Sequence, residues 1–255
     1  MKLPALHRCL PADSLEAGEA YELALAGGYA VQAHGLVTRL SQDLDFATRH
    51  PASMTDIVAR LADGLRGRGW AVAVVDVRPL KARLLVTDSD SREAREVDLL
   101  KEALSRQPVA MGVGPVVDLE DLVIMKVRAL GDRGLPRDVI DVHAACRYYS
   151  VIELEQLGLR DEAEFDLREL RDRLESVVWV SDEEFAAYGL GPDEIAELRQ
   201  WALEWESDLG LRLAEDYEEP EDGQNWVQQS EPVPPSCPGR LARTEAPGEP
   251  HTDIA

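Results

Sequence analysis

The fold of this chain is decided by residues 27–46, which read GGYAVQAHGLVTRLSQDLDF. A glycine pair, Gly27 and Gly28, opens this stretch, and two aspartates, Asp43 and Asp45, stand near its end. On a β-strand, residues two apart point to the same face of the sheet. The two aspartates would therefore direct both carboxylates to one side, about 7 Å apart at their Cα atoms, while the apolar residues beside them face the core.

Two neighbouring carboxylates repel each other unless a cation neutralises them. Mg²⁺ prefers oxygen ligands, and a carboxylate pair combined with substrate phosphates is its usual site in proteins. The pattern therefore predicts that Asp43 and Asp45 bind Mg²⁺. The alternative is a polar edge strand on which two acids happen to fall two residues apart.

The glycine pair strengthens the first interpretation. Glycines before a helix let the backbone approach a ligand closely, and the N–H groups of the first helical turn bind phosphate. The alternative for Gly27 and Gly28 is a plain turn. A glycine pair, a short helix and an Asp-x-Asp strand, in this order, together resemble the DNA polymerase β-like nucleotidyltransferase superfamily. A site of that kind requires a third acid on a neighbouring strand.

Asp98 is the candidate for the third acid. It lies in the strand-like stretch 96–100, where Val97 and Leu99 share one face and Asp98 takes the other. With three acids, one metal ion would hold the triphosphate of an NTP, and a second would lower the pKa of the attacking hydroxyl. The alternative for Asp98 is an exposed acid on a strand.

The pattern along the chain predicts an α+β fold, with a small mixed β-sheet flanked by helices and then a helical C-terminal half. The expected helices are 13–25, a short one ending near 35, 53–66, 119–130, 136–149 and several over 151–213, with a break near 189–192. The expected strands are 44–48, 70–77, 81–87 and 96–100.

The elements divide the chain into three parts. Residues 1–117 form the expected nucleotidyltransferase catalytic core, and residues 118–215 form a helical domain that completes the active site. From residue 216 to residue 255, Pro, Glu, Asp, Gln, Ser and Gly dominate. Such a segment cannot bury enough apolar area to offset its ordering entropy, so a disordered acidic tail is expected.

The net charge of −22 argues against broad non-specific nucleic-acid binding, and no DNA partner is expected. The segment 60–106 is locally basic, with ten Lys/Arg against eight Asp/Glu, so an RNA acceptor remains open. Three scattered cysteines fit a reducing compartment better than a disulfide framework. No stretch approaches the roughly 18 apolar residues of a membrane span, and no signal peptide is recognisable. A soluble, cytoplasmic protein without membrane contact is expected.

One lysine stands out in the helix expected at 119–130. Lys126 falls on the apolar face, where a lysine is costly to bury unless it has a partner. A contact with a phosphate or with an active-site acid would explain its position, and the alternative is a lysine whose ammonium group reaches water. Asp118 is expected to cap this helix, with Asp121 at the capping-box position.

Asp138 and Asp141 lie on the helix that begins at Pro136. Proline suits the first helical position, and an acid in the first turn is favoured by the helix dipole. That account explains Asp138 without any function. Asp141 shares its face with apolar residues and is less easily explained in this way.

Five short stretches between about residues 20 and 150 resemble the AbiEii/AbiGii toxin family, whose members are nucleotidyltransferase-fold proteins and in many cases toxins of bacterial type IV toxin–antitoxin systems. The matching stretches are Gly27-Gly28-Tyr29-Ala30, Arg39-Leu40-Ser41-Gln42-Asp43-Leu44-Asp45-Phe46, Val97-Asp98-Leu99, Asp121-Leu122-Val123-Ile124-Met125-Lys126 and Arg137-Asp138-Val139-Ile140-Asp141-Val142. Two features depart from the pattern: the interval from Gly28 to Asp43 is long, and the acidic tail has no counterpart.

The resemblance implies a role for each matching residue. The nucleotide-binding residues would be Gly27, Gly28, Arg39, Ser41 and Lys126. The metal-binding acids would be Asp43, Asp45 and Asp98, and the catalytic set would add Lys126 and Asp138.

Three functions remain open from the sequence. The leading one is a Mg²⁺-dependent enzyme that moves an NMP from an NTP to an acceptor hydroxyl, for example at a tRNA 3′ end, as the toxin partner of a cognate antitoxin. The second is a nucleotidyltransferase that modifies a small molecule such as an antibiotic. The third is a non-catalytic, nucleotide-binding protein of the same fold, which the presence of all three acids disfavours.

Overall fold

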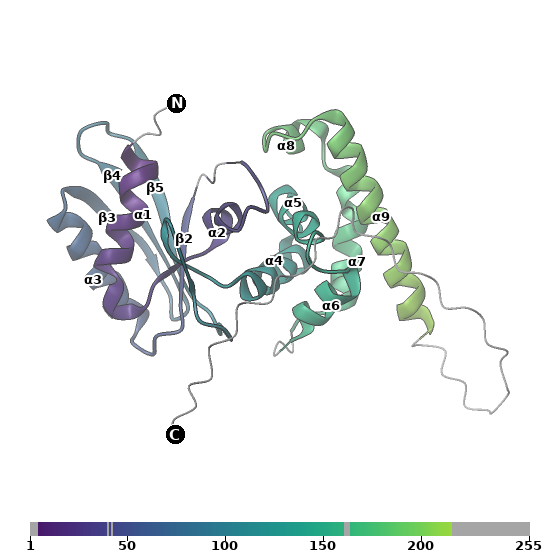
Figure 1. The fold of residues 1–255 in the computed structure, drawn as a ribbon, viewed down its shortest axis with the longest axis horizontal. Helices are drawn as coiled ribbons and strands as arrows, with labels where there is room; N and C mark the ends of the chain where they lie inside the picture. The colour runs from purple at the N-terminus through teal and green to yellow at the C-terminus, as the bar shows by residue number, and fades with distance from the viewer. Residues whose placement is uncertain (1–4, 40, 42, 161–163, 216–255) are drawn as a thin grey trace, which may run out of the picture. The chain divides into compact units, whose positions relative to one another are not determined.

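The computed structural model describes residues 5–39, 41, 43–160 and 164–215 (Figure 1). The chain forms two compact units, Met1–Lys126 and Val127–Ala255. The division between them falls within a helix, a little beyond the division predicted between residues 117 and 118. The mixed sheet and the α+β class were predicted and are confirmed. The tail predicted over 216–255 lies outside the described residues.

The first unit is built on a seven-stranded sheet with the order β3-β4-β5-β2-β1-β7-β6. The pairs β2–β5 and β1–β7 are parallel, and the other neighbours are antiparallel. Its strands are β1 Ala24–Leu25, β2 Leu44–Thr48, β3 Trp70–Val77, β4 Lys81–Asp88, β5 Ala94–Lys101, β6 Val109–Met111 and β7 Gly114–Val116. Its helices are α1 Ala5–Ala17, the 3₁₀ turn η1 Glu19–Tyr21, α2 Gly27–Ala33, α3 Met54–Gly67 and the first part of α4 Leu119–Arg133.

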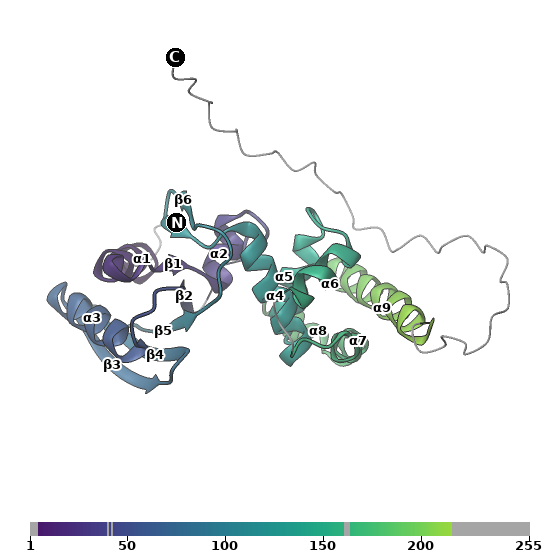
Figure 2. The same ribbon diagram turned by 90° about the horizontal axis from the view of Figure 1, so that it is seen from below.

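One face of the sheet is covered by helices. α3 begins after Ser53, whose Oγ accepts a hydrogen bond from the Asp56 N–H at 3.1 Å. Its apolar stripe packs on β3, and α1 packs beside α3 (Figure 2). The residues of β4 and β5 that are fully buried on this face are Ala82, Leu84, Val86, Val97 and Leu99. The intervening residues of β4 and β5 point to the opposite face, because strand side chains alternate.

The helix predicted over residues 13–25 is wrong. α1 ends before Gly18, and the chain then turns through η1 into β1. A side chain at Gly18 would force Leu23 to move, because its Cβ would lie 2.2 Å from Leu23 Cδ1. Asp13 lies inside α1 and accepts a hydrogen bond from Trp70 Nε1 at 2.8 Å. The aspartate therefore joins α1 to the edge strand β3.

The second unit is helical, as predicted. After the rest of α4, its elements are α5 Pro136–Ala145, α6 Val151–Leu159, α7 Leu167–Ser176, the 3₁₀ turn η2 Val177–Trp179, α8 Asp182–Ala186 and α9 Pro192–Glu215. The predicted break near 189–192 is confirmed, because α9 begins at Pro192. α7 packs along α9 (Figure 2). Among the described residues, no helix combines the length and the apolar character that crossing a membrane requires.

A buried ionic group joins two helices of this unit. Glu155 of α6 is 3% exposed, and its carboxylate accepts hydrogen bonds from Trp205 Nε1 at 2.7 Å and from Arg212 at 2.6 and 2.8 Å. A buried charge is tolerated only with such partners. The contacts therefore fix α6 against α9.

Candidate active site

The glycine pair and Asp45 lie together because β1 and β2 pair antiparallel. The Ala26 N–H donates to the Asp45 carbonyl at 2.9 Å, which places Gly27 directly beside that aspartate. A Cβ at Gly27 would lie 1.8 Å from Asp45 Oδ2, and the backbone φ of Gly27 is +54°. Only glycine permits both the left-handed conformation and this close approach. The first residue of α2 thus packs against a candidate metal-binding carboxylate.

The second glycine packs against Ser41 in the same way. A Cβ at Gly28 would lie 2.4 Å from Ser41 Oγ, and that hydroxyl donates to the Asp43 carbonyl at 2.9 Å. Asp43 occupies the bend just before β2 rather than the strand itself. The Ser41 carbonyl accepts a hydrogen bond from Arg95 Nη1 at 3.2 Å. The structure therefore gathers both glycines, the serine and the two acids of the predicted motif.

Asp98 lies next to Asp45 across the parallel β2–β5 pair, where the two residues are in register. Residues in register on neighbouring strands point to the same face, so the two acids lie on one side of the sheet, as predicted. The Asp98 carboxylate is bound by a residue that the sequence did not indicate. Arg83 Nε and Nη2 donate to its two oxygens at 2.7 and 2.8 Å, and Lys81 Nζ lies 3.3 Å from Oδ2.

These contacts set the electrostatics of the site. Burial alone would raise the pKa of Asp98, but hydrogen bonding from Arg83 and the charge of Lys81 outweigh burial and lower it. The hydrogen bond to Asp98 raises the pKa of Arg83 above its usual value, and the charges of Glu96 and Asp43 add to this effect. Asp43 is therefore close enough to act on the same guanidinium.

The residues of this site differ in their fit to a divalent cation. Asp43 and Asp45 supply hard oxygen donors beside the glycine pair and are each partly exposed. Asp98 is already neutralised by two cations. Among the described residues, no group of three or more His, Cys, Asp or Glu side chains could hold a metal ion. The first two acids thus fit Mg²⁺, whereas the three-acid site stays a prediction.

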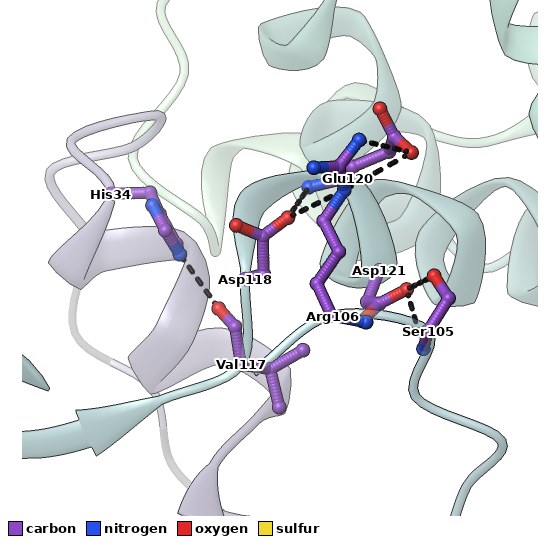
Figure 3. A network of polar contacts seen from close by, with 7 residues as sticks. All are labelled: His34, Ser105, Arg106, Val117, Asp118, Glu120 and Asp121. Carbon is purple, nitrogen blue, oxygen red and sulfur yellow. Dashed lines mark hydrogen bonds and ion pairs between the residues drawn. The ribbon is translucent and has the colours of Figure 1, made fainter. Parts of the chain in front are cut away.

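A polar network fixes the start of α4 (Figure 3). Asp118 Oδ1 accepts from the Glu120 N–H at 2.9 Å, so the predicted cap is confirmed. The capping-box role predicted for Asp121 is wrong: its carboxylate accepts from Ser105 N and Oγ at 3.2 and 2.6 Å and from Arg106 N at 2.9 Å. The network anchors the loop after β5 to the first turn of α4.

The same region joins α2 to α4. His34, which caps the C-terminus of α2, makes a 2.8 Å hydrogen bond through Nε2 to the Val117 carbonyl, just before α4 begins (Figure 3). Lys126 follows further along α4 and is 9% exposed. Its burial agrees with the predicted apolar position, and its contact with a phosphate stays a prediction. Arg39, also predicted to pair with phosphate, is partly exposed in the segment between α2 and β2.

Asp138 lies in the second unit and is fully buried. Its two oxygens accept from Arg133 Nε and Nη2 at 2.8 and 2.9 Å. This pair joins the last residue of α4 to the first turn of α5, which gives Asp138 a structural role. Its predicted catalytic role stays a prediction.

Three solved structures that match this chain illustrate the comparison. JHP933 from Helicobacter pylori has a TM-score of 0.51 at 15% identity, covering 85% of this chain and 98% of that chain. A putative nucleotidyltransferase from H. pylori has a TM-score of 0.50 at 17% identity, covering 86% and 99%. MenT4, a nucleotidyltransferase toxin from Mycobacterium tuberculosis H37Rv, has a TM-score of 0.46 at 17% identity, covering 80% and 87%. At these identities the first two comparisons show a shared fold.

The sequence itself places the chain in a family. No curated protein matches it. Residues 10–219 match the family model described as nucleotidyl transferase AbiEii toxin of type IV toxin–antitoxin systems. That range covers the sheet, the glycine pair, the aspartates and the helical unit. The chain belongs to the AbiEii nucleotidyltransferase toxin family.

Proposed function

We propose that this protein transfers an NMP from an NTP to an acceptor hydroxyl in a Mg²⁺-dependent reaction. The observation that carries the proposal is the packing of Gly27 against Asp45 and of Gly28 against Ser41. This arrangement brings the backbone start of α2 and an acidic pair to one place. Backbone N–H groups and a serine hydroxyl suit a triphosphate, and the acids suit its counterion.

The reaction is an in-line displacement at the α-phosphorus. The acceptor oxygen forms a bond to that phosphorus, the bond to the bridging oxygen of the β-phosphate breaks, pyrophosphate leaves, and the hydroxyl proton is released. Asp43 and Asp45 would hold Mg²⁺, which neutralises phosphate charge and favours the deprotonated acceptor when bound. Gly28 and Ser41 would orient the triphosphate.

Arg39 and Lys126 would add positive charge near the phosphates. Asp138 is the further catalytic residue that the family resemblance implies. These three assignments rest on the family resemblance together with the burial of the lysine and of the aspartate.

RNA is the proposed acceptor, with the hydroxyl of a tRNA 3′ end as the specific case. The net charge of −22 disfavours broad RNA binding, but Lys81 and Arg83 lie on the sheet face that carries Asp45. A local basic surface next to the acids would attract a polyanion. The proposed biological setting is toxicity controlled by a cognate antitoxin.

The experiment is incubation with each of the four α-labelled NTPs, Mg²⁺ and total cellular RNA, followed by electrophoresis. One labelled RNA class is expected. Asp45→Asn should abolish labelling while leaving the thermal midpoint unchanged or raised, because the two acids repel each other without metal. Asp63→Asn, which removes an exposed acid of α3, is the matched control and should label normally.

Two outcomes would overturn parts of the proposal. Label in a small-molecule fraction rather than in RNA would refute RNA as the acceptor but would support NMP transfer. Full activity of Asp45→Asn would refute the chemistry.

A further inference from the structure

The three side chains Arg83, Asp98 and Asp45 form a row across three strands. Arg83 is in register with Asp98 on the antiparallel β4–β5 pair, and Asp98 is in register with Asp45 on the parallel β5–β2 pair. Neighbouring strands are about 4.8 Å apart, so Asp98 separates the arginine from the candidate metal-binding acid. The sheet register alone therefore brings a guanidinium to the face of the predicted nucleotide site.

The two anionic partners of Arg83 differ in exposure. The side chain of Asp98 is 7% exposed and binds the guanidinium through two parallel hydrogen bonds. Glu96 is 43% exposed and contacts Nη1 at 2.6 Å. A buried, bidentate pair is strong, whereas an exposed ion pair contributes little and exchanges readily. The contact with Asp98 should therefore persist when a ligand replaces Glu96.

The same contacts argue against Asp98 as a metal ligand. Both oxygens already accept hydrogen bonds from Arg83, and Lys81 adds a second positive charge at 3.3 Å. A divalent cation would have to displace the guanidinium and overcome the repulsion of both cations.

We propose that Asp98 is a positioning residue that holds Arg83 toward the site, and that the guanidinium binds a phosphate group of the nucleotide or of the RNA acceptor. This inference rests on the proposed function and replaces the expected third metal ligand. The planar fork of arginine matches phosphate oxygens, and the side chain of Arg83 remains 35% exposed. Nη1 would exchange Glu96 for phosphate while Nε and Nη2 stay on Asp98.

The test separates metal binding from phosphate binding. Mn²⁺ binding to the full chain is measured by electron paramagnetic resonance. Calorimetry measures the binding of two phosphate ligands: α,β-methylene ATP in the presence of Mg²⁺, and an oligonucleotide with the sequence of a tRNA 3′ end. Asp98→Asn should leave Mn²⁺ affinity within about threefold, whereas Asp45→Asn should lower it by at least roughly tenfold. Arg83→Gln should leave Mn²⁺ affinity unchanged and weaken one phosphate ligand by roughly tenfold to a hundredfold.

The ligand affected identifies the source of the phosphate. If Arg83→Gln loses affinity for α,β-methylene ATP, Arg83 binds a phosphate of the nucleotide. If it loses affinity for the oligonucleotide alone, Arg83 binds a phosphate of the acceptor. The double variant Asp98→Asn with Arg83→Gln should bind no more weakly than Arg83→Gln, because the aspartate acts through the arginine. Arg78→Gln, which removes an exposed cation in the turn between β3 and β4 that contacts Asp76 at 2.8 Å, should change neither affinity.

Several results would overturn the inference. An equal loss of Mn²⁺ affinity in Asp98→Asn and Asp45→Asn would show that Asp98 is a metal ligand. Unchanged binding of both phosphate ligands in Arg83→Gln would show that Arg83 does not bind phosphate. If Asp98→Asn does not fold, Arg83→Gln and Arg83→Lys are compared instead. The lysine keeps the positive charge but lacks the planar guanidinium with its parallel N–H donors. A wild-type chain that binds neither nucleotide nor oligonucleotide refutes the proposed function itself.

Discussion

Replacement of Gly27 by alanine tests whether the start of α2 and Asp45 form one packed unit. The added Cβ would lie 1.8, 2.5 and 2.8 Å from Oδ2, Cγ and Cβ of Asp45. Real Cβ atoms do not approach so closely, so the carboxylate must move. The same residue has a φ of +54°, which an alanine adopts only with strain.

The magnitude follows from these two terms. A left-handed alanine costs about 1–2 kcal/mol. An overpacked methyl group costs about 1–3 kcal/mol more. Gly27→Ala should therefore destabilise the first unit by about 2–5 kcal/mol. Displacement of Asp45 by about 1 Å should lower NMP transfer by about a hundredfold.

The matched control lies at the other end of the same helix. Gly35 has a φ of +71°, but a Cβ there would meet no atom within 4 Å. Gly35→Ala should cost only the strain of about 1–2 kcal/mol and keep transfer activity. Stability is measured by amide exchange of β2 peptides across a urea series, which reports on the first unit alone. Equal losses of stability and activity in the two variants would refute the close packing.

The remaining predictions concern three carboxylates. Glu155→Gln should lower the free energy of unfolding of the second unit by about 2–3 kcal/mol in urea titration, because a charged pair with an arginine is lost. As a control, Glu204→Gln at an exposed position should change this free energy by less than about 0.5 kcal/mol. Because the pKa of Asp98 is lowered, its pair with Arg83 stabilises the fold fully above about pH 3.8, and this contribution is lost as the pH falls through the lowered pKa. The difference in thermal midpoint between wild type and Arg83→Gln should shrink below that pH, and a constant difference would contradict the pairing. Asp121→Asn should increase amide exchange in the first turn of α4, and unchanged protection would argue against the anchoring network.

The longer elements could be predicted because their side chains carry a clear period. β2 and β3 begin and end at the predicted residues 44–48 and 70–77. β1, with two residues, and the β6–β7 hairpin, with three residues on each strand, were missed. Strands this short show no alternation, and only their pairing with longer neighbours makes them strands. The first helix was misplaced: α1 spans Ala5–Ala17, with Pro11 inside it, rather than residues 13–25.

The part of the candidate site that is local in sequence could be predicted, whereas the part that depends on strand pairing could not. The glycines, Ser41 and the aspartates near β2 lie close together in sequence, and the structure brings them together. The pairing of Arg83 with Asp98 depends on the register of β4 against β5. Arg83 alternates with buried residues and could have been assigned to the face of Asp98. Its partner was hidden because local sequence does not specify which residues lie opposite each other.

Transfer of the nucleoside monophosphate can be distinguished from transfer of the terminal phosphate by the position of a label in the NTP. The full chain is incubated with Mg²⁺ and RNA together with an NTP labelled either at the α- or at the γ-phosphate. Label from the α-position is expected to enter RNA, and label from the γ-position is expected to appear in pyrophosphate. Transfer of the γ-label to RNA would instead show transfer of the terminal phosphate and would refute NMP transfer.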